Sequence, residues 1–61
     1  MNEITDPRAA VAIEALEAVA QAFHDAAATY LETDDVLRAA ICHSAHQRLR
    51  KEAEELAAHL L

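Results

Sequence analysis

The stretch LETDDVL, residues 31–37, decides the fold, because here the sequence both ends one helical pattern and starts another. Thr33 or Asp34 can cap the first amides of a following helix, and the helix dipole favours the negative charges of Asp34 and Asp35 at that end. Glycine is absent from the chain, and the single proline is Pro7, far from this stretch. Two uninterrupted segments joined by so short a connection predict an antiparallel helical hairpin.

The first of these helices is predicted to begin within TDPRAAV, residues 5–11. Asp6 can cap its free amides, and Pro7 fits the first helical position, where a missing N–H costs nothing. Sixteen alanines among 61 residues favour helix throughout the chain. The sequence therefore predicts one all-α domain, with helices over 7–31 and 34–59 and a turn at 32–33.

Each predicted helix carries an apolar seam with spacings of three and four residues, the pattern of helices that pack lengthwise. The expected core residues are Ile13, Leu16, Ala20, Phe23, Ala27 and Tyr30 in the first helix and Ile41, Cys42, Ala45, Leu49 and Leu56 in the second. Two helices alone leave much of such a seam in water. We therefore expect two hairpins to pair as a homodimeric four-helix bundle, with docking on another protein as the alternative.

The size of the chain supports the expectation of a dimer. A domain of about 60 residues buries too little surface to be very stable without a disulfide, a metal or a partner chain. Cys42 is the only cysteine, so no internal disulfide can form, and a single thiol fits a reducing compartment. Self-association is then the expected source of stability.

The charge pattern bears on location and partners. The N-terminal residues MNEITDPR do not resemble a secretory signal, and Glu14, Glu17 and Asp25 interrupt the longest apolar region, residues 9–31. We therefore expect a soluble cytoplasmic protein without a membrane span. The formal net charge of −6 argues against general attraction to nucleic acid or to anionic membranes.

A second surface is predicted on the first helix, opposite its seam. Small apolar side chains alternate there with polar ones, and the residues are Val11, Glu14, Ala15, Ala18, Gln21, Ala22 and Asp25. One interpretation is that alanine serves only helix propensity. The other is that small side chains let a helix of another protein approach closely, which makes this surface the candidate partner-binding site.

The stretch AAICHSAHQRLRK, residues 39–51, holds most of the residues that could do chemistry. On a helical wheel Cys42 lies in the seam, His46 at its margin and His43 on the polar side, which predicts a core cysteine beside solvated histidines. A metal site of Cys42, His46 and His24 is an alternative, although four converging ligands are typical of structural zinc. A third hypothesis is pH sensing by the histidines.

Nucleophilic catalysis is not expected from this stretch. A seam cysteine is inaccessible, and the chain has no glycine to form an amide-lined loop that could stabilise developing charge. The basic residues of QRLRK are followed at once by Glu52, Glu54 and Glu55, which indicates a solvated face with paired charges. We expect no catalytic residues, no cofactor and no resident metal.

The acidic turn near the middle of the chain and the string ICHSAH, residues 41–46, resemble the Rop family of plasmid-encoded RNA-binding four-helix bundles. Rop carries a similar Ile-Cys-x-Ser-x-His string in its second helix, with the cysteine in the core. The resemblance implies a dimeric bundle and a structured-RNA ligand held by the outer surface of the first helix. Here that surface presents Glu14, Glu17, Gln21 and Asp25, of which Gln21 alone matches in type, and acids repel phosphate.

The sequence as a whole predicts a small acidic, non-enzymatic interaction protein that binds a larger macromolecule and inhibits or regulates it. A Rop-like binder of structured RNA and a Cys/His metal-binding bundle are the two alternative functions.

Overall fold

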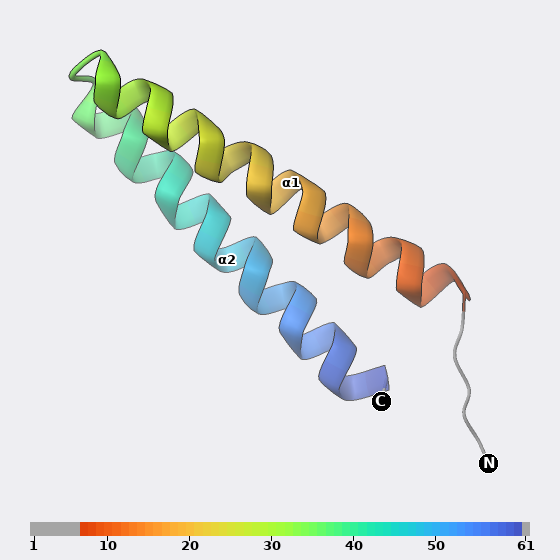
Figure 1. Cartoon of the computed structure of the whole chain (residues 1–61). Coiled ribbons are helices and arrows are strands. Elements are labelled where there is room, and N and C mark those ends of the chain that lie inside the picture. The colour runs from red at the N-terminus through yellow and green to blue at the C-terminus, as the bar shows by residue number, and fades with distance from the viewer. Residues whose placement is uncertain (1–6, 61) are drawn as a thin grey trace.

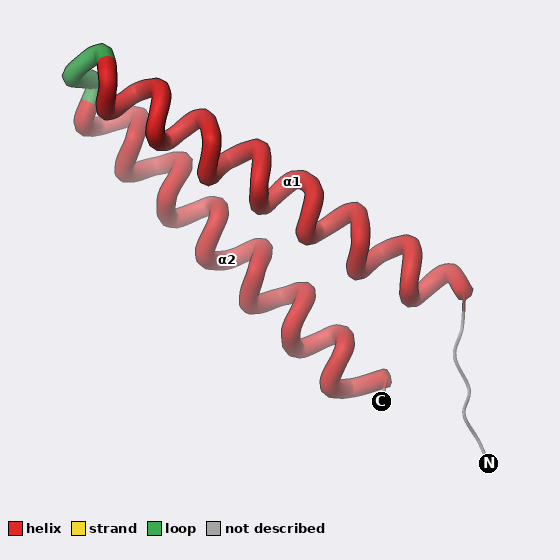
Figure 2. Tube along the Cα trace, viewed as in Figure 1, coloured by secondary structure: helices red, strands yellow, loops and turns green. Residues whose placement is uncertain are grey.

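The chain folds into two long helices that lie side by side and run in opposite directions (Figure 1). The computed structural model describes residues 7–60, and the expected cap at Asp6 lies outside this range. Helix α1 spans Pro7–Glu32 and α2 spans Val36–Leu60, with one short loop between them (Figure 2). The predicted all-α hairpin is confirmed.

The C-terminus of α1 closes with a Schellman motif, in which two amides beyond the helix bond back to its last turn. The Asp35 amide donates to the Tyr30 carbonyl at 2.8 Å, and the Asp34 amide donates to the Leu31 carbonyl at 3.1 Å. This geometry needs a left-handed residue, and Asp34 supplies it with φ of 61°. The helix therefore extends to Glu32, and the predicted turn at 32–33 is in fact residues 33–35.

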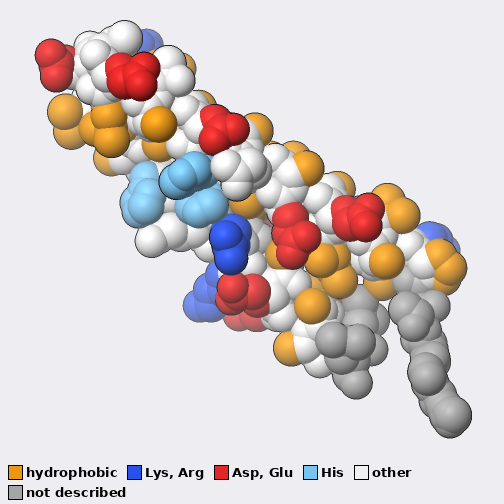
Figure 3. Space-filling model, in the orientation of Figure 1, with side chains coloured by type: hydrophobic (Ala, Val, Ile, Leu, Met, Phe, Trp, Pro, Cys, Tyr) orange, Lys and Arg blue, Asp and Glu red, His pale blue; other side chains and the backbone are white. Residues whose placement is uncertain are grey.

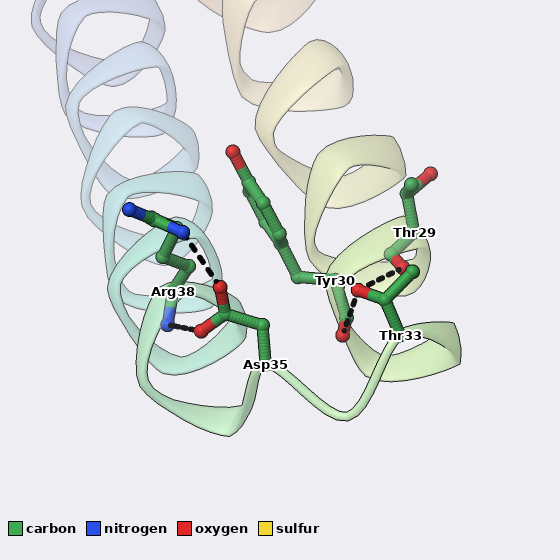
Figure 4. A network of polar contacts seen from close by, with 5 residues as sticks. All are labelled: Thr29, Tyr30, Thr33, Asp35 and Arg38. Carbon is green, nitrogen blue, oxygen red and sulfur yellow. Dashed lines mark hydrogen bonds and ion pairs between the residues drawn. The ribbon is translucent and has the colours of Figure 1, made fainter.

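The N-terminus of α2 is capped by Asp35, whereas the sequence predicted Thr33 or Asp34. The Asp35 carboxylate accepts a hydrogen bond from the Arg38 amide at 3.1 Å (Figure 4). The Asp35 carbonyl accepts one from the Ala39 amide at 3.0 Å. The expectation was wrong because Asp34 is already committed to the left-handed position. The Thr33 hydroxyl instead donates to the Tyr30 carbonyl at 3.1 Å, at the end of α1.

Small side chains fill the contact between the helices. Among the described residues, the buried apolar ones are Ala20, Ala27, Ala39, Cys42 and Ala53. Because alanine projects so little from the backbone, the two helices can pack closely along this line. The larger seam residues are only half-buried: Ile13, Leu16, Phe23, Tyr30, Leu49 and Leu56.

The contact line on α2 differs in part from the expected seam. Ile41 was predicted in the core of the dimer; its side chain is 58% exposed within the single hairpin, so its burial in a dimer stays a prediction. The line instead passes through Ala39, Cys42 and His46, spaced by three and four residues. An isoleucine one residue before Cys42 points about 100° away from it, which carries Ile41 onto the flank of the helix.

Candidate functional site

The two broad faces of the hairpin differ in chemistry. His24, on α1, contacts the ring of His46 on one side of the seam, whereas Tyr30 and Ile41 border a common groove on the other side. On α1, Val19 lies about 90° to one side of the line through Ala20 and Ala27, and His24 lies about 50° to the other side. The seam therefore separates a polar face from an apolar face.

The apolar face comprises side chains that lie on or lean toward the Tyr30 and Ile41 side of the seam. Its residues are Leu16, Val19, Phe23 and Tyr30 from α1 and Ile41, Ala45, Leu49 and Leu56 from α2. Within the single chain Val19 is 47% exposed and the other large members of the face remain at least partly open to solvent.

Two shallow grooves meet at Ile41 on this face. One, of 270 Å³, is lined by Tyr30, Arg38, Ile41 and Cys42. The other, of 390 Å³, is lined by Ala40, Ile41, Ser44, Ala45 and Arg48. Ile41 is thus a projecting apolar side chain with a hollow on either side. Such relief is suited to interdigitation with side chains of another helix.

The polar face carries a cluster of three histidines. The ring centres of His24 and His46 lie 5.0 Å apart and those of His43 and His46 lie 6.4 Å apart. Histidine side chains, in pale blue, gather into one patch near the middle of the molecule, with acidic and basic side chains beside it (Figure 3). The cluster joins the two helices on this face.

His46 is fixed by a hydrogen bond across the seam. Its Nδ1 lies 2.8 Å from the Ala20 carbonyl oxygen. A carbonyl can only accept, so Nδ1 carries the proton, and in the neutral ring Nε2 keeps its lone pair. The sequence placed His46 at the margin of the seam, and the structure places it on the contact line itself, with its polarity satisfied by a backbone oxygen.

The three ligands of the alternative metal site do not come together as a set. Cys42 is a free, buried thiol in the apolar seam. His24 and His46 are brought into contact, and the third member of their cluster is His43. Within the part of the chain that the structure describes, no group of three or more His, Cys, Asp or Glu side chains is placed to hold a metal ion.

The predicted partner-binding residues share the outer surface of α1. Val11, Glu14, Ala15, Ala18, Gln21, Ala22 and Asp25 are all exposed. The Gln21 amide donates to the Asp25 carboxylate at 3.0 Å, one turn further along the helix. The surface therefore combines alanines, which leave the backbone accessible to a close neighbour, with ordered acceptors and negative charge.

Two arginines of α2 form local ion pairs. The Arg38 guanidinium lies 2.9 Å from the Asp35 carboxylate, and Arg50 lies 4.0 Å from Glu54. The hydrogen bond from the Arg38 amide lowers the pKa of the Asp35 carboxyl; partial desolvation opposes this, and the Arg38 guanidinium adds to the lowering. Solvent screens pairs as exposed as these, so they contribute little to stability.

Comparison with known proteins adds no relative: no family model matches the chain, and neither the curated proteins nor the solved structures contain a significant match. Within the described residues, neither helix is both long enough and apolar enough to cross a membrane.

Proposed function

We propose that this chain is a small acidic, non-enzymatic interaction protein that dimerises through its apolar face into a four-helix bundle and binds a larger macromolecule through the outer surface of α1. The observation that carries the proposal is the composition of the hairpin core. The described apolar residues that are buried are alanines and a cysteine, whereas the large apolar side chains stay half-buried or exposed.

Covering the apolar face would add the stability that one hairpin lacks. Full burial of a Val, Leu, Ile or Phe side chain contributes about 1.5–3 kcal/mol relative to exposure. Val19 and Ile41 are each about half exposed, and Phe23 is half-buried. A second copy presents the same face, and a twofold axis makes such a surface complementary to itself.

The distribution of charge favours pairing of unlike helices between the two copies. In α1 four acids stand against one base, and in α2 four bases stand against three acids, which gives −3 and +1. Arg38 and Arg48 line the grooves beside Ile41 on α2. Packing α2 of one copy against α1 of the other places a helix of net positive charge beside one of net negative charge.

In such a dimer the outer surface of α1 remains open to a partner. Ala15, Ala18 and Ala22 let another backbone approach, while Glu14 and Asp25 favour a partner with basic side chains at its contact surface. A protein without catalytic machinery acts by occupying such a surface, and inhibition or regulation of that macromolecule is the proposed outcome.

The solution mass tests the dimer. We expect the wild-type chain to sediment at twice its 6.7 kDa mass. Ile41→Glu places a charge at the centre of the apolar face and should give a monomer. Val11→Glu is the matched control, because Val11 is 65% exposed against 58% for Ile41 but lies outside the apolar face. A monomeric wild-type chain, or equal masses for the two variants, contradicts the proposal.

Crosslinked capture from lysate, with Ala18→Arg as the blocking variant, tests the partner surface. We expect a specific protein to be captured by the wild type and lost with Ala18→Arg, while the variant keeps the dimeric mass. Ala58→Arg, an exposed alanine near the end of α2, is the control that should retain capture. Recovery of nothing but the chain itself would count against an interaction protein of this kind.

A further inference from the structure

The histidine cluster has no part in the proposed dimer or partner surface. We propose that His24 and His46 form a two-imidazole site for a divalent late transition-metal ion, with Cu²⁺ bound most tightly. The remaining coordination positions would be taken by water. Imidazole nitrogen suits copper, nickel and zinc, and the general affinity order of first-row divalent ions peaks at copper.

The spacing of the two rings fits a shared ion. Metal–nitrogen bonds of about 2.0–2.1 Å place the centres of two imidazoles at adjacent positions on one ion about 4.5–5 Å apart. The ring centres of His24 and His46 are separated by 5.0 Å, with an angle of 45° between the ring planes. His43 is farther from His46, at 6.4 Å, and is not assigned as a ligand.

The hydrogen bond of His46 prepares its ring for this role. Histidines that bind metals usually donate their other ring N–H to a carboxylate or a backbone carbonyl, which fixes the tautomer and the orientation. Nδ1 of His46 donates to the Ala20 carbonyl at 2.8 Å, so the lone pair of the neutral ring is on Nε2. Ala20 lies one helical turn before His24, which ties both rings to the same part of α1.

The site is reachable from solvent. The His24 side chain is exposed and His46 is half-buried, on the polar face away from the proposed dimer contact. Two protein ligands agree with the lack of any three-ligand group among the described residues. Cys42, which belonged to the alternative metal site considered from the sequence, is buried in the apolar seam and is not assigned as a ligand.

Titration of the untagged chain with CuCl₂ in a non-coordinating buffer tests the site, and calorimetry reports affinity and stoichiometry. We expect one ion per chain. His24→Asn should weaken binding by at least about tenfold, the scale of loss usual for changes around a metal site. His46→Asn should do the same, while His43→Asn and His59→Asn should retain the wild-type affinity. Circular dichroism checks that each variant stays helical.

Pulsed electron paramagnetic resonance of the copper-loaded chain gives an independent readout. Two imidazole nitrogens should couple to the ion in the wild type and one in His24→Asn, which removes an exposed side chain and leaves the seam intact. Unchanged affinity in His24→Asn, loss of binding in His59→Asn, or a copper signal without imidazole coupling would overturn the assignment. None of these results depends on the oligomeric state of the chain.

Discussion

The backbone amide of Asp35 is hydrogen-bonded to the Tyr30 carbonyl, so the residue that caps the start of α2 also closes the end of α1. The Asp35 amide donates to the Tyr30 carbonyl at 2.8 Å, while its carboxylate accepts the Arg38 amide at 3.1 Å. One residue thus satisfies a free carbonyl of the first helix and a free amide of the second. The stability of the hairpin should depend on this residue more than on its neighbours in the loop.

Replacement of Asp35 tests that dependence. Asp35→Ala removes the cap of α2 and should lower the melting temperature by several degrees, because a first-turn amide loses its acceptor. Asp35→Asn keeps an oxygen acceptor, so its melting temperature should lie between those of the wild type and Asp35→Ala. Thermal melts followed by circular dichroism measure both, and a variant order with Asn below Ala would contradict the capping role.

The same carboxylate predicts a pH dependence. The pKa of Asp35 is lowered in the folded chain, first by the Arg38 amide, from a reference value of 3.8. The unfolded chain therefore binds the proton more tightly, and the added stability is complete above that reference value and lost as the pH falls through the lower folded value. The difference in melting temperature between wild type and Asp35→Asn should shrink in acid. A difference that stays constant into strong acid would exclude this linkage.

Asp34 occupies a left-handed conformation that glycine adopts without steric cost. Asp34→Gly should raise the free energy of unfolding by about 0.5–1 kcal/mol, since the strain removed exceeds the entropy that glycine adds to the unfolded chain. Asp34→Val, with a branched side chain at the same φ, should lower it. Urea denaturation of the two variants at one protein concentration provides the comparison, and equal midpoints would mean that the left-handed turn is not strained.

Ala20 is fully buried, and its carbonyl also accepts the His46 hydrogen bond. Ala20→Leu should destabilise the fold by about 1–3 kcal/mol, because extra methylenes in a close contact push the helices apart. Ala22→Leu is the control, since Ala22 is exposed on the same helix and should change stability little. Equal denaturation midpoints for the two leucine variants would show that the alanine seam tolerates added bulk.

The Cys42 thiol is buried in the seam. It should therefore react slowly with a disulfide reagent such as Ellman's in native buffer and at once in denaturant, with a rate set by opening of the hairpin. Ala20→Leu should accelerate the native reaction. Immediate reaction of the native wild type would show that the thiol lies on the surface, and the assignment of buried and exposed sides of α2 would then be wrong.

The sequence was sufficient to predict the two helices, because few residues in it could break a helix, and the expected seam of α1 includes Ala20 and Ala27, which are buried. It did not identify the cap. Thr33, Asp34 and Asp35 are all good capping residues, and the choice among them follows from which one takes the left-handed position when the chain reverses. That choice depends on the joint geometry of both helices.

The histidine cluster was only partly predictable. Helical spacing puts His46 near Cys42. A polar ring is nevertheless expected at the edge of the seam and not within it, unless its hydrogen-bond partner is known. The partner is the backbone carbonyl oxygen of Ala20. Every residue has such an oxygen, so the sequence does not indicate which one accepts the hydrogen bond. The pairing of His24 with His46 likewise depends on the alignment of α1 against α2, which the loop of residues 33–35 determines.

Asp35, the loop residue that contacts both helices, also determines how α2 is rotated about its own axis. Since each residue turns a helix by about 100°, one amino acid inserted between Asp34 and Asp35 would swing Ile41 out of line with Tyr30 and carry another side of α2 into its place. The length of the loop therefore determines which side chains of α2 lie on each face of the hairpin.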